Sequence, residues 1–290
     1  MRAAADMPTV ETLIGREKLP ISYQTIVGKF WSPLAERMAE WRRASPGPLI
    51  VGVNGGQGSG KTTLCRFLEE RLLPEHGLRA VTVPLDDFYF PKAQRNSLAA
   101  AVHPLFAVRG VPGTHNVALL KEALSRLKNG DGAVIPKFDK AADDSAPERE
   151  WRRIAGPADI ILFEGWCVGA APQRSEDLNE PVNALEMRED PEGVWRRRAN
   201  AALSSDYREL FTLIDRLVML RAPDMEMILR NRLEQERKLR DANPGGANVM
   251  SDDEVARFVQ FYERLTRSMF AEMPARADVV FDLSVIQAAH

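Results

Sequence analysis

The sequence predicts a doubly wound α/β fold with a mainly five-stranded parallel sheet, to which an N-terminal helical segment and a helical lid are added. Three observations support this prediction. Apolar strand-like runs alternate with helical patterns along most of the chain. A glycine-rich stretch of the form G-x-x-x-x-G-K-[ST], residues 55–62, joins the first run to a helical pattern. A continuous apolar run at 160–163 is closed by Glu164, as in a strand buried on both faces.

The strands expected in the sheet are short apolar runs separated by helical segments. They cover residues 49–53, 80–85, 159–165, 216–220 and 279–283. A further run at 133–140 is expected to be a short edge strand, because Pro136 cannot donate a ladder hydrogen bond and argues against a central position.

Helical periodicity occupies most of the intervals between these strands. Helices are expected from residue 63 onward, at 114–128, 199–214 and 224–241, and from a capping box at 251–254 to about residue 269. Two segments lack clear periodicity. Residues 91–113 predict a long loop or a short-helix excursion, and residues 166–195, rich in Pro, Asn and charge, predict a long loop.

An amphipathic pattern also precedes the first strand, at residues 21–43, where Pro33 marks a first turn or a kink. Two prolines that flank a glycine at 46–48 then end the helix. The chain is therefore expected to divide into an N-terminal helical extension, residues 1–48, and one domain, residues 49–290. This domain is expected to carry an insertion at about 91–150 and a lid at about 224–250.

Composition excludes several classes of protein. The 290 residues carry a formal net charge of −2, which gives no global attraction toward nucleic acid or an anionic membrane surface. No apolar run approaches the roughly 20 residues that span a bilayer, and residues 1–11 lack an apolar signal-peptide core, so a cytoplasmic location is expected. Cys65 and Cys167 are isolated and are expected to be small buried apolar residues. Composition leaves the oligomeric state open.

The glycine-rich stretch is expected to bind phosphate. Glycines allow backbone N–H groups to approach phosphate oxygens where a Cβ would obstruct them. Lys61 is placed to reach the β- and γ-phosphates, and the Thr62 hydroxyl is placed to ligate Mg²⁺. The expected nucleotide-binding residues are Gly55, Gly56, Gln57, Gly58, Ser59, Gly60, Lys61, Thr62 and Thr63.

Three acids are expected at the same edge of the sheet: Asp86, Asp87 and Glu164 each lie at or just past the end of a predicted strand. In phosphoryl transfer to a hydroxyl, one carboxylate accepts the proton and another orients the metal or its water. Asp86 is expected to be the base and Glu164 the acid on the metal side. Asp87 remains open as an alternative base, or as a solvated or capping side chain.

The helix at 224–241 is rich in arginine. At about 100° per residue, Arg230 and Arg237 lie on one side together with Arg240. Such a helix suits a lid whose guanidinium groups stabilise charge on a transferring phosphoryl group. A solvated helix face is an equally good interpretation of the pattern, since Glu234 and Lys238 form an i,i+4 pair.

These motifs resemble those of a known family. Residues 55–62, 85–89, 138–139 and 163–165 look like the P-loop kinases of the phosphoribulokinase, uridine kinase and pantothenate kinase group. Longer blocks look most like the D-glycerate 3-kinases: HPL at 103–105, RGVPGTH at 109–115, PKFDKAADD at 136–144, EGWCVG at 164–169 and residues 257–267. The resemblance extends from about residue 50 to residue 283. Asn116 departs from it, because an Asp is expected after the Gly-Thr-His run.

The resemblance implies transfer of phosphate from ATP, with Mg²⁺, to the 3-hydroxyl of D-glycerate. It assigns catalytic roles to Lys61, Asp86, Glu164, Arg230, Arg237 and Arg240, and metal binding to Thr62 and Glu164. A hydroxy-acid substrate carries a carboxylate, for which Arg109, His115 and Lys137 are the expected cationic donors. The residues expected to bind the acceptor are Asp86, Tyr89, His103, Arg109, Thr114, His115, Lys137 and Asp139.

Two other functions stay open. A nucleoside or pantothenate kinase would use the same scaffold with a different acceptor. A regulatory ATPase would bind nucleotide and signal through a partner, although the many polar residues between 102 and 144 exceed what nucleotide binding requires.

Overall fold

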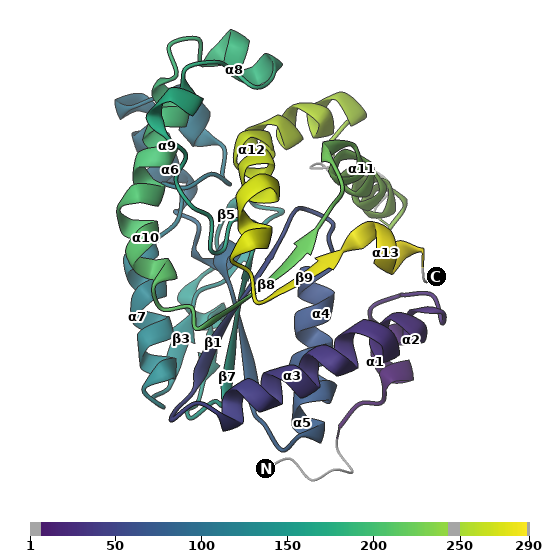
Figure 1. Ribbon diagram of the computed structural model, residues 1–290. Helices are drawn as coiled ribbons and strands as arrows, with labels where there is room; N and C mark the ends of the chain where they lie inside the picture. The colour runs from purple at the N-terminus through teal and green to yellow at the C-terminus, as the bar shows by residue number, and fades with distance from the viewer. Residues whose placement is uncertain (1–6, 243–249, 289–290) are drawn as a thin grey trace.

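The computed structural model describes residues 7–242 and 250–288, and a five-stranded parallel sheet lies at its centre (Figure 1). The strand order is β2-β7-β1-β8-β9, and every pairing is parallel. The strands are β1 (Leu49–Gly55), β2 (Ala80–Pro84), β7 (Ile160–Gly165), β8 (Arg216–Arg221) and β9 (Val279–Asp282). The predicted doubly wound α/β fold is therefore confirmed, together with all five predicted strands.

Alternate residues of each central strand point to opposite sides of the sheet. Because successive residues of these strands are apolar, both faces of the sheet are apolar. Ile50 and Ile161 belong to one hydrophobic core, whereas Val51 and Leu162 belong to the other. Every residue of β1 and β7 is buried. This two-sided burial explains why these strands read as continuous apolar runs in the sequence.

One face is covered by the N-terminal helices and by the helix that follows β1 (Figure 1). Trp31 packs edge-on against Phe281 of β9, with ring centroids 5.2 Å apart. The N-terminal helices thus share a core with the sheet, and the domain boundary at residues 48–49 stays a proposal. The elements on this face are α1 (Val10–Arg16), α2 (Tyr23–Ile26), π-helical η2 (Val27–Trp31), α3 (Ser32–Arg43), α4 (Lys61–Phe67), π-helical η3 (Leu68–Leu72), α5 (Leu73–Glu75) and α13 (Leu283–Gln287).

The opposite face is covered chiefly by α7, α10 and α12, and the second core lies beneath them. The helices on this side are α6 (Lys92–Ala101), α7 (Val117–Lys128), α8 (Ala184–Glu189), α9 (Val194–Ser204), α10 (Asp206–Phe211) and α12 (Asp252–Glu272). Short 3-10 turns complete the chain: η4 (Leu85–Phe88), η5 (Pro104–Ala107), η6 (Glu148–Glu150), η7 (Ser175–Leu178) and η8 (Met273–Ala275).

The prediction of an edge strand at 133–140 is wrong for the central sheet. This stretch divides at Pro136 into β3 (Ala133–Ile135) and β4 (Phe138–Asp139). They pair antiparallel with β6 (Arg152–Ile154) and β5 (Asp144–Ser145), respectively, in two separate small sheets. The outer edge of β2 is instead covered by side chains: Thr82 N–H donates to Glu69 Oε2 over 3.0 Å, and Arg152 donates to the Thr82 carbonyl.

Two other predictions need correction. The predicted loop at 166–195 contains η7, α8 and the start of α9. The predicted helix at 199–214 is two helices that meet at Ser205, whose φ and ψ of −113° and −103° are not helical. Helix α8 is held in the structure by an ion pair rather than by an apolar stripe: Glu186 is fully buried and pairs with Arg264 over 2.7 Å. The sequence of this helix therefore lacks the apolar periodicity from which a helix is predicted.

The predicted start of α12 is confirmed, because the capping box of Ser251 and Glu254 begins it. The helix predicted at 114–128 begins later, at Val117, where Asn116 accepts a hydrogen bond from Leu119 N–H over 3.1 Å. The arginine-rich helix is α11 (Met225–Ala242). The predicted break at 243–246 lies outside the described residues.

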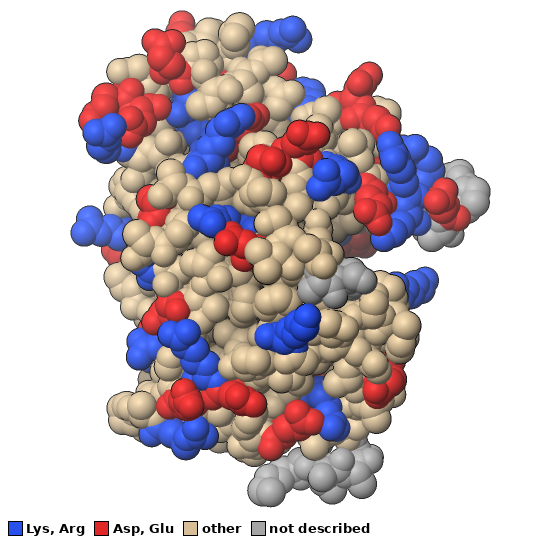
Figure 2. All heavy atoms as spheres, turned by 45° about the vertical axis from the view of Figure 1, so that its right-hand side comes forward, with Lys and Arg blue, Asp and Glu red and all other residues tan. Residues whose placement is uncertain are grey.

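Charge on the surface agrees with the near-neutral composition. Figure 2 shows Lys and Arg interspersed with Asp and Glu over the face that it presents. In the described part of the chain, no helix combines the length and apolarity needed to cross a lipid bilayer.

Candidate active site

The glycine-rich loop joins the end of β1, at the centre of the sheet, to the start of α4. Gly60 precedes α4 with φ 83°, a left-handed conformation that glycine adopts without steric cost. The first turn of a helix has backbone N–H groups without intrahelical acceptors, and these favour anions. The Ser59 hydroxyl oxygen in this loop is buried without a hydrogen-bond partner among the described residues. The loop therefore has the geometry of a phosphate cradle.

Glu164 lies beside this loop, in β7. Its neighbours in the parallel ladder are Val53 of β1 and Pro84 of β2. The Thr62 hydroxyl donates to Glu164 Oε1 over 3.1 Å, whereas the buried Oε2 has no partner in the described part of the chain. Burial raises the pKa of Glu164, and the Lys61 ammonium opposes this effect.

The unpartnered carboxylate oxygen and the adjacent hydroxyl are suitable ligands for Mg²⁺. No cluster of three or more His, Cys, Asp or Glu side chains that could hold a metal occurs among residues 7–242 and 250–288. Mg²⁺ commonly binds through one or two protein groups, substrate phosphates and water. Thr62 and Glu164 thus fit the ion that the loop implies.

Asp86 follows β2, within η4, and both of its carboxylate oxygens have partners. Tyr89 donates its hydroxyl hydrogen to Oδ1 over 3.1 Å, and Lys140 Nζ lies 2.7 Å from Oδ2. Burial alone would raise the pKa of Asp86, but the ammonium groups of Lys140 and Lys61 together hold it well below its usual range. Asp86 is therefore a carboxylate anion close to the phosphate cradle.

Asp87 has a different environment. Its Oδ1 accepts a hydrogen bond from Phe138 N–H over 3.3 Å, which fixes β4 beside η4. Burial raises the pKa of Asp87. The geometry therefore favours Asp86 over Asp87 as the base, and gives Asp87 a role in holding the Phe138 backbone.

Tyr89 is held in place by aromatic neighbours. The His115 ring stacks on it with centroids 4.3 Å apart, and Phe138 packs edge-on at 5.3 Å. His115 Nδ1 lies 2.5 Å from the Tyr207 hydroxyl oxygen, and burial lowers the pKa of His115 to about 3. His115 is consequently neutral at physiological pH and supplies no positive charge.

The cations expected to face the acceptor have other partners. Arg109 forms an ion pair with Asp143 and lies 5.4 Å from the centroid of the Phe138 ring. Lys137 is exposed and pairs with Glu150 over 3.1 Å. Of the two, only Arg109 lies against the aromatic group around Tyr89.

Three further predicted residues contact groups other than Asp86. Thr114 is fully buried, and its hydroxyl donates to the Val111 carbonyl over 2.7 Å. Asp139 Oδ1 accepts from the N–H groups of Ala141 and Ala142 in an exposed turn. His103 caps η5, and its Nε2 lies 3.8 Å from Asp190 Oδ1. None of these contacts brings the three side chains to Asp86.

Helix α11, the predicted lid, contacts the phosphate loop through residues other than its arginines. Asn231 Nδ2 donates to the Gly58 carbonyl over 3.4 Å. Arg237 Nη2 lies 3.4 Å from Asp252 Oδ2, and Arg240 Nη2 donates to the Met250 carbonyl over 2.9 Å. Arg230 is exposed on the same helix. Arg237 and Arg240 thus contact residues at or just before the start of α12, whereas Arg230 faces solvent.

Lys140, Tyr207 and Arg95 were missed as site residues. Lys140 belongs to the PKFDKAADD block, which was a usable signal. Arg95 is fully buried and donates to three carbonyls, those of Phe90, Ala107 and Asp143, so it holds the segments around the site together. No local pattern distinguishes such an arginine from a surface one.

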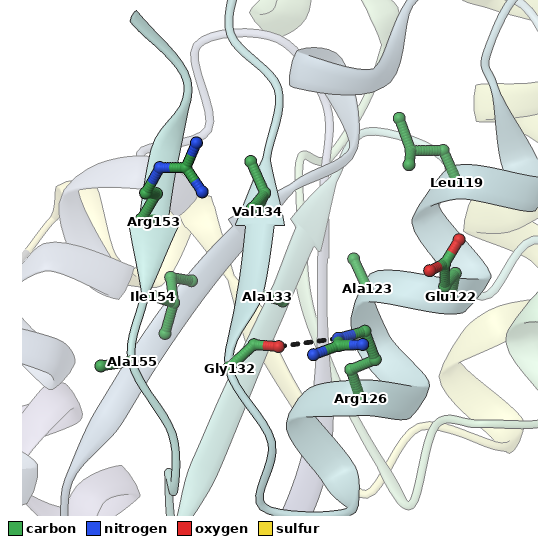
Figure 3. Close-up of a pocket in the computed structure, with 10 residues that line it drawn as sticks. All are labelled: Leu119, Glu122, Ala123, Arg126, Gly132, Ala133, Val134, Arg153, Ile154 and Ala155. Atoms are coloured by element: carbon green, nitrogen blue, oxygen red, sulfur yellow. Dashed lines mark hydrogen bonds between the residues drawn. The ribbon is translucent and has the colours of Figure 1, made fainter. Parts of the chain in front are cut away.

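A groove of ≈ 510 Å³ lies elsewhere, between α7 and the β3–β6 sheet (Figure 3). Within it, Arg126 Nε donates to the Gly132 carbonyl over 2.8 Å. Its lining includes none of the phosphate-loop residues and neither Asp86 nor Glu164. The cradle and its two acids, rather than this groove, are thus the candidate active site.

Comparison with known proteins identifies a related family. The model of the phosphoribulokinase/uridine kinase family matches residues 50–171, which contain the loop, Asp86 and Glu164. An uncharacterized kinase of Schizosaccharomyces pombe is 37% identical over 228 residues, 74% of this chain and 78% of that protein.

Two D-glycerate 3-kinases are also similar. The chloroplastic enzyme of Arabidopsis thaliana is 30% identical over 242 residues, which cover 80% of this chain but only 50% of that protein. The solved structure of the Cryptococcus neoformans enzyme matches with a TM-score of 0.71 at 25% identity, covering 87% of this chain and 94% of that one.

Proposed function

The chain belongs to the phosphoribulokinase/uridine kinase family of P-loop kinases, and we propose that it phosphorylates the 3-hydroxyl of D-glycerate with ATP. The products are 3-phosphoglycerate and ADP. The observation that carries the proposal is Asp86: an ionised carboxylate beside the phosphate cradle, with Lys140 on one oxygen and Tyr89 on the other. The similarity to two D-glycerate 3-kinases supports this acceptor.

The donor side consists of the phosphate loop, Lys61, Thr62 and Glu164. Loop N–H groups and the Lys61 ammonium bind the phosphates of ATP, and Thr62 and Glu164 hold Mg²⁺. When bound, this ion neutralises charge on the phosphates. Lys61 also interacts electrostatically with both Asp86 and Glu164, so one cation serves both sides of the reaction.

On the acceptor side, Asp86 accepts the proton of the 3-hydroxyl as its oxygen forms a bond to the γ-phosphorus. The bond between that phosphorus and the β–γ bridging oxygen breaks, and ADP leaves with the electron pair. A base with a low pKa suffices here, because phosphoryl transfer depends mainly on positioning and charge neutralisation rather than on early proton removal. Arg230, Arg237 and Arg240 are proposed to add positive charge when α11 closes over the phosphates.

The acceptor's identity is tested by a substrate panel. Purified protein is given ATP, Mg²⁺ and one acceptor at a time, and ADP release is measured for D-glycerate, L-glycerate, uridine and pantothenate. D-glycerate is expected to give the highest kcat/KM. A preference for uridine or pantothenate contradicts the proposed acceptor, and ATP hydrolysis that no acceptor accelerates favours a regulatory ATPase.

A further inference from the structure

The three residues expected to bind the substrate carboxylate have other partners or carry no charge. Arg109 is bound to Asp143, which also pairs with the fully buried Arg95 over 2.9 Å. Lys137 pairs with Glu150. His115 is buried beside Tyr207 and carries no charge at physiological pH. None of these three is a free cation for a substrate carboxylate.

Lys140 differs from them because its anionic partner is the base itself. Its side chain is 62% exposed and extends from the turn between β4 and β5, yet its ammonium meets the base at 2.7 Å. A long, flexible side chain with one anionic partner can change that partner at little conformational cost. Lys140 is thus the cation best placed to meet an incoming anion beside Asp86.

The contact between these two residues also occupies the base. Tyr89 donates to Oδ1 of Asp86 and Lys140 donates to Oδ2, so an acceptor hydroxyl that donates to Asp86 shares an oxygen with one of them. Departure of one partner would give the hydroxyl an unshared oxygen and make the carboxylate a stronger base. Tyr89 is stacked between aromatic neighbours and buried, so Lys140 is the partner that can leave.

We propose that Lys140 is a substrate-binding residue that exchanges partners, leaving Asp86 for the carboxylate of the acceptor. This inference rests on the proposed function, because it requires an acceptor with a carboxylate. The exchange couples recognition to chemistry: only an acid frees Asp86 to receive the hydroxyl proton. An alcohol without a carboxylate leaves Lys140 on the base and is a poor acceptor.

The exchange has a distinctive signature in binding. Asp86 and the acceptor carboxylate compete for the ammonium group of Lys140. Removing the charge of Lys140 and removing the charge of Asp86 are therefore expected to have opposite effects on acceptor affinity. Lys140→Met is expected to weaken D-glycerate binding about 10- to 100-fold, the effect of losing a hydrogen bond between charged groups. Asp86→Asn is expected to strengthen it, and the double variant is expected to bind as weakly as Lys140→Met alone.

Titration calorimetry of the full chain with D-glycerate, in the presence of Mg²⁺ and a non-hydrolysable ATP analogue, measures these affinities. Lys140→Arg retains a cation and is expected to bind within about threefold of wild type. Lys121→Met is the matched control, because Lys121 is an exposed lysine paired with Glu209 away from the site. Melting temperatures of all variants establish that they are folded.

Two negative results are distinguishable. In the first, the wild-type protein binds D-glycerate, but Lys140→Met and Asp86→Asn both weaken binding or neither of them weakens it. Partner exchange is then contradicted, while the proposed function stands. If the wild-type protein does not bind D-glycerate, the proposed function fails and the exchange fails with it.

Discussion

The Thr62 hydroxyl donates to Glu164 Oε1 over 3.1 Å and thereby joins the first turn of α4 to the end of β7. The second carboxylate oxygen is buried and has no partner among the described residues. An unpaired buried carboxylate oxygen is costly unless a cation or a donor occupies the site during function. This pair is accordingly the expected metal position.

Glu164→Gln is expected to lower kcat by roughly 10² and to raise the Mg²⁺ concentration needed for half-maximal activity, because the amide cannot supply a negative ligand. Burial raises the pKa of Glu164, so the neutral amide is expected to leave the melting temperature unchanged or higher. Magnesium titration of activity together with thermal unfolding checks both points. An unaltered Mg²⁺ requirement removes Glu164 from the metal site.

Asp86→Asn is expected to reduce kcat by a factor on the order of 10² to 10⁴, with ATP binding retained, because the amide cannot accept the hydroxyl proton. Asp87→Asn is the matched comparison. Its amide oxygen can still accept from Phe138 N–H, so the loss is expected to stay below about tenfold. Steady-state kinetics of both variants decide between the two acids, and the reverse ranking would make Asp87 the base.

Gly58→Ala tests the contact between the loop and α11. Gly58 has φ 71°, and a Cβ there would lie 2.7 Å from Asn231 Cβ. The left-handed backbone alone costs an alanine roughly 1–2 kcal/mol. The ratio of folded to unfolded protein is therefore expected to fall about 5- to 30-fold, and the clash with Asn231 is expected to displace the loop and lower ATP affinity. Equilibrium nucleotide binding measures this.

Gly28→Ala is the control for that substitution. Nothing lies within 4 Å of a Cβ at Gly28, which is in the helical segment η2. Alanine is expected to raise stability there by about 0.4–1 kcal/mol without changing ATP affinity. Normal ATP affinity in Gly58→Ala would mean that α11 does not rest on the loop.

Stability is expected to fall with acidification because His115 is buried and neutral. Its pKa is lowered from 6.5 in the unfolded chain to about 3 in the folded protein. Between these values the unfolded chain binds a proton that the folded protein does not, so stability present above pH 6.5 is lost as pH falls toward 3. The slope from this one group is at most about 1.4 kcal/mol per pH unit.

Urea unfolding of wild type and His115→Gln between pH 4 and 7 checks this effect. The variant is expected to lose this contribution to the slope, whereas His76→Gln, at an exposed position, is expected to keep it. Identical slopes for His115→Gln and wild type would mean that His115 is charged in the folded protein.

The sequence predicts the central sheet well because burial on both faces leaves a simple signal. Leu49–Gly55 and Ile160–Gly165 are buried throughout, and such strands appear as continuous apolar runs. The small sheets are different. Phe138–Asp139 pairs with only two residues, which is too short for any periodicity, and its position depends on the distant carboxylate of Asp87.

The candidate site is predictable to the same extent. Lys61, Thr62, Asp86 and Glu164 follow from a loop motif and from strand ends, which topology alone brings together. The acceptor side depends on the tertiary structure. Burial removes the charge expected for His115, and ion pairing engages Arg109 and Lys137. Lys140 reaches Asp86 across 54 residues of sequence, a contact that no local pattern indicates.

The most direct test of the central claim is phosphorus NMR of the product formed from ATP and D-glycerate. Phosphate on the 3-hydroxyl is attached to a CH₂ group, so its phosphorus resonance is expected to split into a triplet in the proton-coupled spectrum. A doublet would place the phosphate on the 2-hydroxyl, and the absence of any phosphoester signal would mean that D-glycerate is not the acceptor. Either result would contradict the proposed function.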